Sequence, residues 1–557
     1  MSWLRLLHPR PPDPPKPGPD GRAPPAADGK APPAGPPPIT GRLALGLLGA
    51  VLGSLMSNLN TRLDTFALVD LRGGVGLGLD EGAWVTEAFN IASIAIVPIT
   101  PWLSGVISPR RAIAAAVALL TLAAVAVPGA TSYPALVAFR FLQGVGGGAL
   151  IPLLLGTVLR FLPMYQRNWG FAVYALLTTL TPLVSESIAG ALDEYLGWQA
   201  IFWQNLLPGA VTIVLVLVGL PDEEVKLEAF AKADTFGMFT AVVFAGTLTA
   251  GLDQGQRLDW FSSGLITGLF VAAGTALAVF IWHSLTTKEP LIELRLLGRV
   301  NLSCGLLTIV AFSFASLGTS YILPQFGTEI AGFRELQVGD ILIVVAISQL
   351  VLCPLAAALL RVVDARVLLV GGLTLATVGS RLATYVTADW VRGDFLLPLF
   401  VQACGLPFIM VPLLLVSTTT LQPQDAVAGG TLFNVLRTLA GSIGTAVIGA
   451  VITVRERVHS NLIVSHITAG AQATVQREAQ GGPAAVAAAA TRQAYVMAYA
   501  DAYGVLGMVT LAGLLVVLFM QETRVSYPPK AGVSKDDAPG GGPLKDGAPA
   551  QAVGAPS

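Results

Sequence analysis

Residues 134–159 read PALVAFRFLQGVGGGALIPLLLGTVL, a long apolar run in which Arg140 is the single charged residue. An α-helix of this length exceeds the hydrocarbon core of a bilayer, which is about 30 Å thick. Charged residues are rare at that depth because each needs a partner or a use. The run therefore predicts a transmembrane helix with a functional or pairing role for Arg140.

The rest of the chain has the same character. Of 557 residues, 54% are hydrophobic and only 12% are charged, whereas soluble domains carry about 25% charged residues. The sequence predicts an all-α polytopic membrane protein of about fourteen transmembrane helices. The predicted spans are 43–68, 83–107, 112–129, 134–159, 170–192, 200–220, 236–252, 262–284, 303–325, 338–360, 366–387, 394–417, 428–453 and 499–521.

Three segments differ from the spans. Residues 1–41 and 522–557 are rich in Pro, Ala and Gly, and such composition predicts a disordered leader and tail. Most Arg and Lys residues of the short loops, such as Arg110 and Arg160, fall on the side of the N-terminus, so both termini are expected in the cytoplasm. The polar, Ala-rich segment 455–497 then lies outside and is predicted to form a helical hairpin.

Composition also excludes several classes of function. The formal net charge of -1 argues against nucleic acid as a partner. The three cysteines lack metal or disulfide spacing and the four histidines are scattered, so neither a metal nor another cofactor is expected. No phosphate-binding Gly-x-x-x-x-Gly-Lys-Ser/Thr motif is found, so the energy for transport is expected from an ion gradient rather than from a nucleotide, and no enzymatic activity is predicted.

Several motifs in order resemble one family. The run LVAFRFLQGVG at 136–146 with LIP at 150–152, LDQG at 252–255, and FNVLRTLAGSIGT at 433–445 are similar to motifs of the major facilitator superfamily. In particular they resemble the fourteen-span drug:proton antiporters of the EmrB/QacA type, EmrB-like branch. The resemblance implies six-helix bundles at 42–220 and 303–521, with two extra helices in the linker 221–302. It also implies a bacterial inner membrane, a periplasmic adaptor and an outer-membrane channel.

The chain departs from that family at two helices. Asn60 stands where the family has an acidic residue, and Asp64 follows one turn later. In the fifth span Pro182 and Gly190 match, but Ser185 and Glu186 stand where Gly and Pro are usual. Glu186 thus adds a titratable group that the family pattern lacks.

The buried charges are the candidates for proton coupling. Counted at 1.5 Å per residue, Asp64, Glu87, Arg140 and Glu186 lie about 6 to 9 Å below the outer span ends. Carboxylates at that depth beside a guanidinium can exchange protons at working pH; the alternative is that they lie near the interface in water. The candidates for the substrate cavity are Asn60, Gln143, Asn434 and Arg437, and Arg437 either binds an anionic substrate or ties helices together. Residues expected to serve helix packing are Gly144, Gly146, Pro152, Pro182, Gly190, Gly441 and Gly444.

These features favour a secondary active transporter. The expected function is proton-coupled efflux of a small organic compound, either a drug or a weak organic acid, by alternating exposure of a central cavity. Two alternatives stay open, a metabolite uptake carrier and a non-transporting membrane receptor or scaffold. A scaffold gives no reason to bury Arg140, Glu186 and Arg437.

Overall fold

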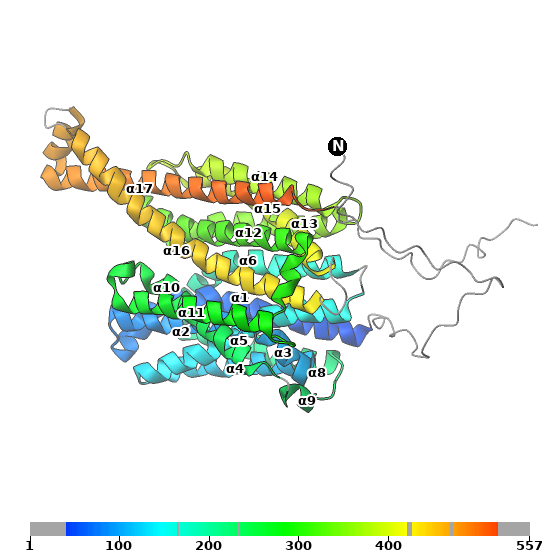
Figure 1. The fold of residues 1–557 in the computed structure, drawn as a ribbon. Helices are drawn as coiled ribbons and strands as arrows, with labels where there is room; N and C mark the ends of the chain where they lie inside the picture. Colours follow the sequence, from blue (N-terminus) through cyan, green and yellow to red (C-terminus); the bar gives the residue numbers. More distant parts are fainter. Residues whose placement is uncertain (1–39, 164–165, 232, 420–425, 468–471, 522–557) are drawn as a thin grey trace, which may run out of the picture. The chain divides into compact units, whose positions relative to one another are not determined.

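The computed structural model describes residues 40–163, 166–231, 233–419, 426–467 and 472–521. Except for residues 40 and 41, the predicted leader and tail lie outside these ranges. Within them every regular element is helical (Figure 1). The side chains of Asp64, Pro182, Glu186 and Gly190 also lie outside the described part, although their helices are described.

The first group of helices packs around α1. Helix α1 packs against α5, α6 and α8, while α5 also contacts α2 and α4. The elements are α1 (Gly41–Val75), α2 (Leu79–Ala95), α3 (Thr100–Ile107), α4 (Pro109–Ala126), η2 (Val127–Gly129), α5 (Tyr133–Phe161), α6 (Arg167–Leu196), α7 (Gln199–Trp203) and α8 (Leu206–Gly219).

The second group packs around α12 and α15. Helix α12 contacts α15, α16 and α17, and α14 packs between α15 and α17. The elements are α12 (Val300–Gln325), η6 (Phe326–Ile330), α13 (Glu335–Leu359), α14 (Ala365–Ala383), α15 (Arg392–Thr419), α16 (Ala426–His466) and α17 (Gln472–Val517). Between the groups, the chain forms α9 (Leu227–Ala231), α10 (Thr235–Gly255), η4 (Trp260–Ser262), α11 (Gly264–Thr286) and η5 (Leu294–Gly298).

Each predicted span is occupied by one helix or by two consecutive helical segments. In the described residues, 12 helices are long and apolar enough to cross a membrane, and a bent pair makes 13. Helix α6 occupies the remaining predicted span at 170–192. The bent pair joins Asp80–Ala95 to Thr100–Ile107 at 62° within the predicted span 83–107, and Pro98, which has no N–H to donate, lies in the break.

Helices α16 and α17 run well past the predicted spans. Helix α16 continues to His466 and α17 begins at Gln472, so the segment predicted as a separate hairpin consists of extensions of two span helices. The two extensions project beyond the other helices (Figure 1).

Small residues allow the closest helix contacts. A Cβ added at Gly144 would lie 2.3 Å from the carbonyl oxygen of Phe89 on α2, and one at Gly146 would lie 2.6 Å from that of Ala116 on α4. In the second group, a Cβ at Gly444 on α16 would lie 2.4 Å from the carbonyl oxygen of Phe314 on α12. Gly441, also on α16, packs against Leu317 of α12. Backbones this close exclude any side chain, which is how membrane helices associate without a hydrophobic driving force.

The two groups meet along two different interfaces. On one, α6 packs directly against α13 and α15. On the other, α2 and α16 touch only slightly because α10 packs against both, with α11 beside it. The extra pair of helices is therefore inserted into one side of the boundary between the groups.

Candidate functional site

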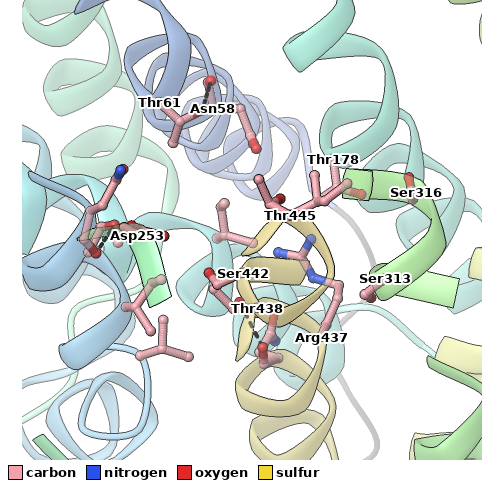
Figure 2. Close-up of a pocket in the computed structure, with 18 of the residues that line it drawn as sticks. Asn58, Thr61, Thr178, Asp253, Ser313, Ser316, Arg437, Thr438, Ser442 and Thr445 are labelled. Atoms are coloured by element: carbon pink, nitrogen blue, oxygen red, sulfur yellow. Dashed lines mark hydrogen bonds between the residues drawn. The ribbon is translucent and has the colours of Figure 1, made fainter. Parts of the chain in front are cut away.

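A polar cavity of about 440 Å³ lies between the two groups of helices. Its wall draws on α1, α2, α5, α6, α10, α12, α15 and α16 (Figure 2). Hydroxyl, amide and ionisable side chains dominate the lining, namely Ser57, Asn58, Thr61, Glu87, Asn90, Ser93, Thr178, Thr179, Asp253, Gln256, Ser313, Ser316, Tyr321, Asn434, Arg437, Thr438, Ser442 and Thr445. A site of this size and polarity suits a small organic molecule.

Arg437 brings the positive charge into this wall. Its side chain extends from α16 into the cavity (Figure 2). The hydroxyl of Tyr174 on α6 lies near the guanidinium, and that hydroxyl donates a hydrogen bond to Oδ1 of Asn434. Among the described residues, Arg437 forms no ion pair with a carboxylate. Its charge is thus available to an anionic ligand.

A pair of carboxyl groups lines another part of the wall. The carboxyl of Asp253, near the end of α10, lies beside the side chains of Glu87 and Asn90 on α2. Carboxylates only accept hydrogen bonds, so two carboxyl groups bond to each other only if one carries a proton. The pair is therefore a candidate site for a proton inside the cavity.

Asp253 was absent from the residues predicted for proton coupling. The hydropathy of the chain places the end of the span at residue 252, whereas α10 continues to Gly255. Asp253 therefore lies just outside the predicted span. The signal that points to it is the LDQG motif, in which it is the one acidic residue.

Arg140 lies in a hydrogen-bonded network behind the cavity wall. It is 1% exposed, and its Nη1 donates to Oε1 of Gln143 at 2.7 Å. Gln143 Nε2 donates to Oδ1 of Asn60 at 2.9 Å, and Asn60 Nδ2 donates to Oδ1 of Asn205 at 2.7 Å. The guanidinium carbon lies 4.7 Å from the ring centroid of Phe89, a cavity-lining residue. This arrangement suits a cation–π contact.

The predicted site residues therefore separate into different places. Glu87, Asn434, Arg437 and Pro152 line the cavity. Asn60 and Gln143, expected at the cavity, are instead buried in the network of Arg140. The amide groups of both residues are taken up by hydrogen bonds within the protein, so they are not presented to a ligand.

A polar cavity shared by two groups of membrane helices defines a solute transporter. The model of the Major Facilitator Superfamily matches residues 40–445, and the chain belongs to that superfamily. It is a multi-pass membrane protein with the fold of that family, not an enzyme.

Among curated relatives, the chain is similar to the multidrug export protein EmrB of Escherichia coli K12, with 27% identity over 419 residues that cover 75% of this chain and 82% of EmrB. It is 28% identical to the fatty acid resistance protein FarB of Neisseria gonorrhoeae over 433 residues, which cover 78% of this chain and 85% of FarB.

Two solved structures share the fold. The human organic anion transporter MFSD10 (TETRAN) aligns with a TM-score of 0.53 and 14% identity, covering 85% of this chain and 100% of that one. The proton:xylose symporter XylE aligns with a TM-score of 0.53 and 14% identity, covering 87% and 97%. Such low identity supports the fold alone.

Proposed function

We propose that this protein is a proton-driven exporter of small amphipathic organic compounds across a bacterial inner membrane. The observation that carries the proposal is a single cavity lined both by two neighbouring carboxyl groups, Glu87 and Asp253, and by the cation Arg437. A proton site and a ligand site that share one cavity can be coupled by alternating access. The names of EmrB and FarB, a multidrug exporter and a fatty acid resistance protein, agree with efflux.

The carboxyl pair can couple the proton to cavity opening because its two helices belong to different parts of the protein. Glu87 lies on α2 of the first group and Asp253 lies on the inserted helix α10. A shared proton stabilises the contact between these helices. Loss of that proton leaves two carboxylates in contact, and their repulsion favours separation of α2 and α10. Glu186 and Asp64 remain candidates for further proton carriers in this scheme.

The test is transport by purified protein in proteoliposomes, screened with a panel of amphipathic cations and anions. Glu87→Gln and Asp253→Asn should each abolish accumulation driven by a pH gradient, while exchange at equal substrate concentrations continues because it needs no net proton movement. Glu289→Gln, which alters an exposed loop carboxylate, is the control and should pump normally. If both cavity variants pump normally at every pH, the carboxyl pair is not the proton site.

We further propose that the extensions of α16 and α17 face the periplasm, both termini being cytoplasmic, and bind an adaptor that leads to an outer-membrane channel. Val458, Leu462 and Val464 on α16 are 41%, 51% and 58% exposed. Exposed apolar side chains on a projecting helix pair are suited to bind a helical partner.

Leu462→Asp should abolish resistance in cells whose other pumps are deleted, yet leave proteoliposome exchange unchanged, because only the partner contact is lost. Asn461→Asp, at the neighbouring exposed position, is the matched control and should keep resistance. Full resistance with Leu462→Asp would argue against a partner at this surface.

A further inference from the structure

A second cavity, of about 520 Å³, lies beside the polar one. Its walls come mainly from α10, α11, α16 and the segment 292–297, with one residue each from α2 and α12, and among the described lining residues Thr438 is the only one with a polar side chain. We call it the apolar chamber. Its volume falls in the range of small-molecule sites, about 300 to 1,000 Å³, but a polar ligand would lose its hydrogen bonds there.

The inserted helices create this chamber. Ala241 and Ala245 on α10 line it and are 3% and 2% exposed. Their methyl groups fill little of the space between α10, α11 and α16, while larger side chains such as Phe244 and Phe280 form the rest of the wall. The chamber thus belongs to the interface where α10 separates α2 from α16.

The chamber reaches the outer surface of the helices. Ile281 and Leu285 on α11 line it, and they are 40% and 48% exposed. Exposed apolar side chains on a transmembrane helix face lipid. A hydrocarbon chain can therefore enter the chamber from the bilayer without passing through water.

The chamber also borders the polar cavity. Ile94, Val97 and Thr438 line both spaces. Arg437 precedes Thr438 on α16 and lines the polar side, whereas Val435 and Leu436 line the apolar side. One turn of α16 therefore places a cation and a hydrocarbon wall at the junction of the two cavities.

We propose that the apolar chamber is a subsite for the hydrocarbon chain of an anionic, single-chain amphiphile whose head group binds Arg437. This inference rests on the proposed function and adds the class of substrate and its route of entry. The positive charge of Arg437 selects the anionic head group, and the apolar chamber selects the hydrocarbon chain. A permanent resident lipid is the competing occupant.

The experiment measures counterflow of labelled alkanesulfonates in proteoliposomes, because these anions stay charged and do not cross lipid as neutral acids. Decanesulfonate should half-saturate transport at a concentration at least about tenfold lower than butanesulfonate does, since each buried methylene adds affinity. Leu277→Trp, which fills the chamber from α11, should remove this advantage and leave butanesulfonate unchanged. Val271→Trp, on the exposed face of the same helix, should change neither. Decyltrimethylammonium should show no comparable gain over its butyl homologue.

Three results would overturn the inference: no chain-length advantage in the unaltered protein, an advantage that survives Leu277→Trp, or a copurified phospholipid that decanesulfonate fails to displace in native mass spectrometry. If Leu277→Trp does not yield folded protein, Ala245→Leu provides a smaller filling change with the same expected result. If the protein transports other compounds in a proton-driven manner but does not transport alkanesulfonates, this inference is refuted and the proposed function is not. Absence of proton-driven transport for the whole panel would refute the proposed function itself.

Discussion

Arg140 and Arg437 each place a guanidinium within a transmembrane helix, but their surroundings differ. Arg140 is 1% exposed and is held by Gln143, by the amide of Asn60 beyond it, and by the ring of Phe89. Arg437 lines the polar cavity and lies near the hydroxyl of Tyr174. A buried charge surrounded by hydrogen-bonding partners stabilises its own structure, whereas a charge beside an open cavity is available to a ligand.

The two arginines also connect different parts of the molecule. The network of Arg140 joins α5 to α1 and, through Asn205, to the start of α8, all in the first group. Tyr174 lies on α6 in the first group and Arg437 on α16 in the second. Binding of an anion at Arg437 therefore changes a contact between the groups, while the hydrogen-bonded network of Arg140, Gln143, Asn60 and Asn205 joins helices of the first group. This difference predicts a structural effect for one substitution and a transport effect for the other.

The largest effect is expected from Arg140→Ala. It leaves Oε1 of Gln143 without its present donor in a buried place, at a cost of about 1 to 3 kcal/mol for an unsatisfied group. Yield of folded protein and thermal stability in detergent should both fall, and all transport activity should be lost with them. Arg140→Lys should recover little, because an ammonium cannot reproduce the planar guanidinium over Phe89.

Normal thermal stability of Arg140→Ala, combined with loss of pH-driven transport alone, would contradict this expectation. It would return Arg140 to the proton-coupling role that the sequence suggested.

Hydropathy predicted the helices well for a physical reason. Lipid tolerates only segments that satisfy their own backbone groups, so long apolar runs and helices coincide. The predicted ends of the helices were less accurate, because the surroundings of a span change gradually from lipid to water at its ends. An error of three residues at α10, whose predicted span ended at 252 and whose helix ends at Gly255, was enough to hide Asp253.

The site itself was predicted only in part. Glu87, Asn434 and Arg437 were predicted and line the cavity, but Asn60 and Gln143 face a network instead. The face of a helix that lines a cavity depends on how the helix is rotated about its axis when it packs against its neighbours. That rotation cannot be predicted from a single sequence. The apolar chamber was not predicted at all, since it arises where α10 inserts between α2 and α16.

The smaller effect is expected from Arg437→Gln, and it sharpens the comparison of the two arginines. Arg437 lines an open cavity and forms no ion pair with a carboxylate among the described residues, so yield and thermal stability should stay near those of the unaltered protein. Transport of decanesulfonate should fall about tenfold, which corresponds to the loss of one charge-assisted hydrogen bond, and Arg437→Lys should keep part of the activity. Tyr174→Phe is the matched control for position, because it removes the hydroxyl and keeps the charge; its effect should be milder than that of Arg437→Gln. If Arg437→Gln lowers stability as much as Arg140→Ala does, both arginines are structural, and the head-group site lies elsewhere in the cavity.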